Sequence, residues 1–173
     1  MKKVFLATLL AALCMAPGAL AARETLVIEG STTVGPVADA FTEAFKRMHP
    51  ELDITVKKTG SGDGAAALVD DRCDIANMSR FMKDNEFKKA IDNGVYPVAH
   101  VVALDGVCVV VHPSNPVKTL SSSQVRRIYN GEITNWSQLG GTDRRVVAIS
   151  RDTASGTYGV FDDVIMGDEK MAP

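Results

Sequence analysis

The alternation of strand-like and helix-like segments is the feature that most constrains how this chain folds. Short apolar or β-branched runs are followed repeatedly by stretches with helical periodicity, and Gly or Pro residues separate many of them. Such alternation favours an α/β fold built on a largely parallel sheet. Strands are predicted over residues 25–29, 52–57, 74–78, 97–104, 107–112 and 145–150, and helices over residues 37–48, 65–71, 84–93, 121–129 and 156–165.

The first 22 residues have the composition of a cleavable signal peptide. Lys2 and Lys3 precede an apolar run from Val4 to Met15, and small residues in the A-x-A arrangement follow as far as Ala22. The run is shorter than the roughly 20 residues that a membrane-spanning helix needs. Leucine directly before Cys14 argues against lipidation at that cysteine. We therefore expect removal of residues 1–22 on export, a periplasmic location, and no stable membrane insertion of the remaining chain.

The charge balance gives no sign of a nucleic-acid partner. The chain has 19 basic and 21 acidic residues, a net charge of −2 and no block of Lys or Arg. Two cysteines, Cys73 and Cys108, follow the signal peptide. They either pair in an oxidising compartment or serve as small buried apolar residues.

Three segments share an order in which a strand ends, small and hydroxyl residues follow, and a helix begins. They are residues 30–36, 59–64 and 151–157. Free backbone N–H groups at a helix N-terminus favour an anion, and Ser or Thr hydroxyls add rotatable donors. Arg151 supplies a fixed fork of donors that suits a tetrahedral oxyanion. Each segment taken alone is also compatible with an ordinary helix cap or turn.

Motifs for other chemistry are missing from the sequence. There is no G-x-x-x-x-G-K-[ST] phosphate loop, no G-x-G-x-x-G after a strand and no G-x-S-x-G nucleophile elbow. The three histidines, His49, His100 and His112, have no metal-ligand spacing. We therefore expect neither a metal nor a cofactor, and no catalytic residue.

The order of the longer motifs resembles the phosphate-binding subunit of the bacterial phosphate ABC importer. The Tyr-Asn-Gly-Glu-Ile-Thr-Asn-Trp stretch and the Arg-x-x-x-Ser-Gly-Thr element are the most specific parts, and the resemblance covers essentially all of the chain after the signal peptide. The matching segments are residues 30–36, 60–64, 74–80, 103–106, 109–116, 128–136 and 151–157.

The resemblance implies a periplasmic-binding-protein-like (type II) fold with two lobes, here incomplete at the C-terminus. Residues 23–104 would form the first lobe and residues 105–173 a truncated second lobe, with a hinge at residues 104–107. Because family members are considerably longer, we expect the chain alone to be weakly stable and to bind poorly. The resemblance also implies a monomer that delivers inorganic phosphate to a membrane ABC permease complex.

The phosphate-binding residues follow from the same resemblance. Some family members carry an aspartate, which accepts the proton of phosphate, where Ser79 stands here, so a tetrahedral oxyanion is a firmer expectation than phosphate. Asp63 and Asp105 are alternative acceptors, and Arg80 is either a charge lining the cleft or half of a structural ion pair. The predicted ligand-binding residues are Thr32, Thr33, Val34, Ser61, Ser79, Arg151, Ser155, Gly156 and Thr157.

Two other functions remain open at the level of sequence. The same anion loops could serve an exported phosphatase or phosphoryl-transfer enzyme, although no activated nucleophile is visible. They could also belong to a sensory or adhesive module that shares the fold but not the transport role.

Overall fold

The computed structural model describes residues 25–173. The signal peptide predicted for residues 1–22 lies outside the described residues and stays a prediction. Within the described part, none of the helices has the length and apolar character needed to cross a membrane.

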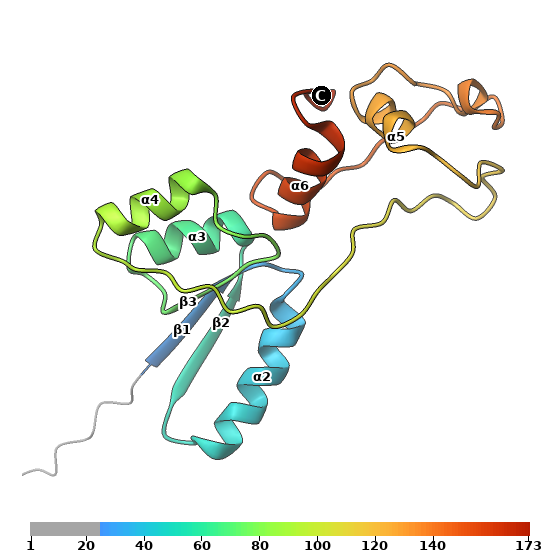
Figure 1. Ribbon diagram of the computed structural model, residues 1–173. Coiled ribbons are helices and arrows are strands. Elements are labelled where there is room, and N and C mark those ends of the chain that lie inside the picture. Colours follow the sequence, from blue (N-terminus) through green and yellow to red (C-terminus); the bar gives the residue numbers. More distant parts are fainter. Residues whose placement is uncertain (1–24) are drawn as a thin grey trace, which may run out of the picture.

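The N-terminal unit, residues 25–94, is a three-stranded parallel sheet flanked by helices (Figure 1). Strands β1 (Thr25–Gly30), β2 (Asp53–Lys58) and β3 (Ile75–Asn77) are ordered β2-β1-β3. The chain crosses between them through α2 (Gly35–Met48) and α3 (Ser61–Val69), and α4 (Asp84–Asp92) follows β3. These elements confirm the strands and helices predicted for this part, and with them the α/β class.

Helix α3 begins four residues earlier than predicted, and its glycines explain why. The Ser61–Gly64 stretch reads as a loop because glycine is a poor helix former. A Cβ on Gly64 would lie 2.7 Å from both the carbonyl oxygen of Glu29 and the Cα of Gly30. The first turn of α3 therefore rests directly on the end of β1, and tertiary packing overrides local propensity.

The core of this unit is built mainly from small side chains. The fully or nearly fully buried apolar residues are Ile28, Ala38, Ile54, Ala65, Ala67, Val69, Cys73 and Ala90. Cys73 is buried, whereas Cys108 is exposed, and neither forms a disulfide. Burial raises the pKa of the Cys73 thiol, and the nearby Glu29 and Asp74 carboxylates add to that increase.

The strands predicted over residues 97–104, 107–112 and 145–150 are wrong. These runs have no regular secondary structure, and their apolar side chains are open to water, with Leu104 93% and Ile149 80% exposed. A strand needs a hydrogen-bonded neighbour to be stable. Among the described residues, the only pairing near them is one isolated antiparallel bridge between Asn135 and Arg145.

The regular elements of the C-terminal unit, residues 121–173, are helices joined by long irregular segments (Figure 1). It contains α5 (Ser122–Tyr129), the short 3-10 helix η1 (Trp136–Leu139), α6 (Gly156–Phe161) and the π-helical turn η2 (Asp162–Met166). Ser121 caps α5, because its hydroxyl accepts the amide of Gln124. The predicted helix over residues 156–165 is confirmed. It changes from an α-helix to a π-helix at Asp162.

Replacing Gly64 with alanine tests the contact between α3 and β1. Helix propensity alone would make this change stabilising by about 1 kcal/mol. The new methyl group would meet backbone atoms that cannot rotate away, so we expect a net loss of about 1–3 kcal/mol in the free energy of unfolding. Urea unfolding of the variant measures it.

Gly106→Ala is the matched control, because a Cβ at Gly106 meets no atom within 4 Å. Its stability should stay close to that of the wild type. A Gly64→Ala chain that is as stable as the wild type would contradict the close approach of α3 to β1.

Candidate anion-binding site

Three serines from separate loops meet at the carboxyl ends of the strands. Ser31 follows β1, Ser61 opens α3 and Ser79 follows β3. The hydroxyl of Ser79 lies 3.2 Å from those of both Ser31 and Ser61, and its amide donates to the Ser61 hydroxyl (3.1 Å). We call these three residues the serine cluster. Loops after adjacent parallel strands converge at one edge of the sheet, which is where open α/β sheets bind ligands.

Ser31 organises the loop that leads into α2. Its hydroxyl oxygen accepts the amides of Thr33 (3.1 Å) and Val34 (3.2 Å). This turn leaves the Thr32 and Thr33 side chains exposed. Ser31 was not among the predicted site residues, although a serine two positions before Thr33 is a recognisable signal for such a hydroxyl turn.

The loop before α6 packs directly onto the serine cluster. The amide of Gly62 donates to the carbonyl of Ala154 (2.9 Å). A Cβ on Gly156 would lie only 2.3 Å from the hydroxyl oxygens of both Ser61 and Ser79. The two units can meet this closely only because residue 156 has no side chain.

Two further polar contacts join the units beside this one. The hydroxyls of Thr33 and Thr157 lie 3.3 Å apart, and a terminal nitrogen of Arg151 donates to the Thr32 hydroxyl (3.1 Å). The Arg151 side chain is 45% exposed and only loosely paired with Asp152, at 3.6 Å. Its guanidinium therefore remains accessible at the rim of the contact.

Ser155 has a local role in the structure. It is buried, and its hydroxyl accepts the amide of Tyr158, which caps α6. The cap fixes the direction in which α6 leaves the contact, and with it the position of Gly156 and Thr157.

All the predicted site segments thus meet in one place. Seven of the nine predicted ligand-binding residues make contacts across the units or within the serine cluster. The polar groups of the other two, Val34 and Ser155, bond within their own loops. The contacting residues are Thr32, Thr33, Ser61, Ser79, Arg151, Gly156 and Thr157. Hydroxyl donors with one accessible guanidinium suit a tetrahedral anion. Anion binding by these residues stays a prediction.

A hollow in the described residues lies away from this contact. It has a volume of about 500 Å³ and is lined by residues of α5, the extended segment at residues 145–150 and residues 171–173. None of the predicted site residues lines it.

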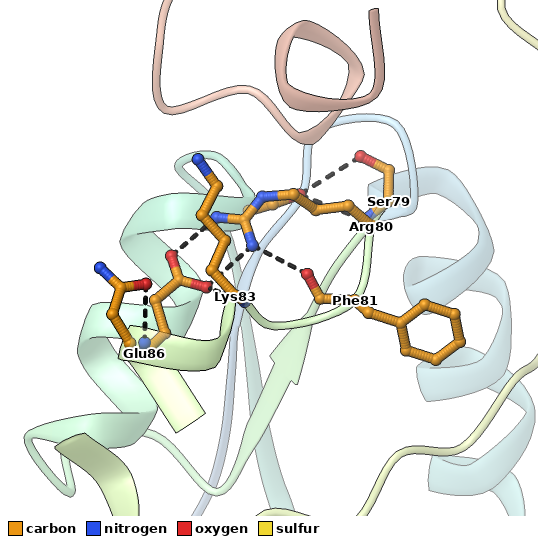
Figure 2. A network of polar contacts seen from close by, with 7 residues as sticks. Ser79, Arg80, Phe81, Lys83 and Glu86 are labelled. Atoms are coloured by element: carbon orange, nitrogen blue, oxygen red, sulfur yellow. Dashed lines mark hydrogen bonds and ion pairs between the residues drawn. The ribbon is translucent and has the colours of Figure 1, made fainter. Parts of the chain in front are cut away.

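Arg80, next to the serine cluster, belongs to an ion pair (Figure 2). Its two terminal nitrogens donate to the two carboxylate oxygens of Glu86, both at 2.8 Å, and one of them also donates to the carbonyl of Phe81 (2.9 Å). Glu86 in turn accepts the amide of Lys83, which caps α4. Of the two roles left open for Arg80, the structure favours the structural ion pair.

The pKa of Glu86 reflects this pairing. Burial alone would raise it, but the hydrogen bonds from Arg80 and from the Lys83 amide, together with both positive charges, outweigh that effect. The pKa of Glu86 is therefore lowered from its ordinary value, and the carboxylate stays ionised at neutral pH.

The alternative proton acceptors do not contact the serine cluster. Asp105 accepts the amide of Gly106, its neighbour in the chain, and Asp63 lies exposed in the first turn of α3. Glu29, the buried carboxylate of β1, is bonded to Thr59 and paired with Lys57.

Solved structures of relatives share this architecture. A putative phosphate ABC transporter substrate-binding protein from Clostridium perfringens, solved with bound phosphate, matches with a TM-score of 0.73 and 37% identity over 85% of this chain and 57% of that one. An ABC-type phosphate transport receptor from Vibrio cholerae matches with a TM-score of 0.66 and 33% identity, covering 82% of this chain and 55% of that one.

Curated relatives agree with these structures. The phosphate-binding protein PstS of Bacillus subtilis is 34% identical over 146 residues, or 84% of this chain and 47% of that protein. The one from Staphylococcus haemolyticus is 33% identical, covering 83% of this chain and 46% of that protein. The chain spans about half the length of the curated relatives it matches. These relatives confirm the resemblance that the motifs indicated.

The two units meet through polar contacts, and interfaces between units are common places for small-ligand sites. The family model of the PBP superfamily domain matches residues 16–171, and the chain belongs to that superfamily. The predicted fold class is confirmed. The boundary predicted at residues 104 and 105 stays a prediction.

The Arg80–Glu86 pair predicts how stability depends on pH. Because the pKa of Glu86 is lowered in the folded chain, the pair stabilises the fold above the ordinary carboxyl pKa of about 4.3 and loses this effect as pH falls through the folded pKa. The Glu86→Gln variant has no carboxyl group at this position, so its stability lacks this pH-dependent contribution. The free-energy difference between wild type and variant should therefore shrink in acid.

Urea unfolding of both chains, from neutral pH down to about pH 3, measures this difference across the ordinary carboxyl pKa. A gap between wild type and variant that stays constant over the whole range would contradict the ion pair.

Proposed function

We propose that this chain captures inorganic phosphate between its two units. The observation that carries the proposal is the contact of Thr33 with Thr157 and of Arg151 with Thr32, which joins donors 124 and 119 residues apart in sequence. The proposed phosphate ligands are the residues predicted from the sequence: Thr32, Thr33, Val34, Ser61, Ser79, Arg151, Ser155, Gly156 and Thr157.

The chemistry of these groups fits phosphate. The anion presents four oxygens, and the loops supply hydroxyls that can rotate to donate. Arg151 adds positive charge in a planar fork that can hold two oxygens at once. The exposed side chain of Arg151 is accessible to an anion that enters between the units.

The names of the relatives support the same ligand. The curated relatives are phosphate-binding proteins, and one of the matching structures contains bound phosphate. We propose further that the chain is exported to the periplasm, acts as a monomer without catalysis, and delivers its phosphate to a membrane ABC permease complex.

Titration calorimetry with phosphate, and with sulfate as a second oxyanion, tests the proposal. We expect the folded chain to bind phosphate at neutral pH, and to bind it weakly, as predicted from the sequence. Arg151→Ala should weaken that binding by at least about tenfold, because it removes charge-assisted hydrogen bonds. Arg151→Lys should restore only part of it, since lysine keeps the charge but not the fork.

Arg47→Ala is the matched control. Arg47 is an exposed arginine on α2 that pairs with Glu43, and its loss should leave phosphate affinity unchanged. A folded wild-type chain that binds neither anion would refute the proposed function. Equal binding by wild type and Arg151→Ala would refute the assigned site.

A further inference from the structure

Arg80 is unusual among the charged residues near the proposed site. Its side chain is 10% exposed, which makes it the least exposed cation in any ion pair of the described residues, whereas that of Arg151 is 45% exposed. A buried charge is costly unless it is paired and hydrogen-bonded. The partner of Arg80 therefore determines what this residue contributes to its surroundings.

Arg80 lies next to α6, the helix that packs onto the serine cluster. A Cβ on Gly159 would lie 3.2 Å from Cδ and 3.5 Å from Nε of Arg80, and one turn earlier Gly156 touches Ser79. In Figure 2 the ribbon of the C-terminal unit passes over Ser79 and Arg80. The guanidinium is thus part of the wall next to the proposed phosphate position.

Glu86 uses both terminal nitrogens of this guanidinium. The two 2.8 Å hydrogen bonds form a bidentate pair, and the Glu86 side chain is only 21% exposed. The pair therefore places no net charge beside the serine cluster. The positive charge accessible to an anion there is that of Arg151.

From this geometry we propose that Glu86 sets the anion affinity of the site by neutralising Arg80. The inference rests on the proposed function and names a residue outside the proposed phosphate ligands. Glu86 acts through Arg80 and does not touch the anion. Removing its charge, while keeping its shape, leaves one uncompensated positive charge in a poorly solvated wall and strengthens anion binding.

The Glu86→Gln variant isolates this charge. Glutamine at the third position of α4 still supports the helix cap, so the change is nearly isosteric. We expect phosphate affinity at low salt to rise by roughly three- to tenfold, and the gain to shrink as salt screens the added charge. A purely structural role for Glu86 predicts instead an unchanged or weaker affinity.

Asp92→Asn is the matched control, because it removes the same charge from the same helix at an exposed site paired with Lys88. Its phosphate affinity should equal that of the wild type. If Asp92→Asn gains as much as Glu86→Gln, the effect comes from overall charge, and the proposal is overturned.

The double variant Arg80→Met/Glu86→Gln provides a second test that does not depend on an unpaired buried charge. Residues 80 and 86 of this variant carry no net charge, as in the wild type. Its phosphate affinity should therefore stay within roughly twofold of the wild-type value. A large loss would mean that Arg80 itself holds the anion and would overturn the proposal.

Failure of this inference is distinguishable from failure of the proposed function. A folded wild-type chain without phosphate binding contradicts the function. Wild-type binding together with an unchanged or weaker affinity in folded Glu86→Gln contradicts only the role of Glu86.

Discussion

The close approach of Gly156 to the serine cluster is the contact on which the rest of the site depends. A side chain at residue 156 would overlap the hydroxyls of Ser61 and Ser79, since even a Cβ would lie 2.3 Å from them. The absence of that atom lets α6 reach the N-terminal unit. Once it does, Thr157 lies beside Thr33, and the loop carrying Arg151 lies beside Thr32. Donors distant in sequence thereby come within reach of one small ligand.

Much of the N-terminal unit could be predicted from sequence because its signals are local. Helix α2 ends before Pro50, and Gly94 follows α4 with the positive φ that glycine favours. The predicted strands at residues 97–104, 107–112 and 145–150 failed for the complementary reason. Apolar β-branched sequence shows that a segment is suited to a sheet, but a strand exists only where a neighbour supplies its hydrogen bonds.

The candidate site, too, could be predicted from the sequence only in part. The hydroxyl and glycine loops were visible in the sequence, and the structure brings them together. Ser31 was missed because its bonds to the amides of Thr33 and Val34 lie inside its own loop, and its contact with Ser79 exists only in the folded structure. The role of Arg80 could not be decided because several acidic residues were possible partners. Glu86 accepts the amide of Lys83 at the start of α4, but lysine before a helix is not a capping signal, so the sequence did not point to Glu86.

The most direct test of the account is a crystal structure of the chain grown with phosphate. We predict a phosphate between the two units, bonded to the hydroxyls of Thr33 and Thr157 and to the guanidinium of Arg151, with Arg80 still paired with Glu86. Phosphate bound in the hollow beside α5, or Arg80 turned away from Glu86 onto the anion, would contradict it.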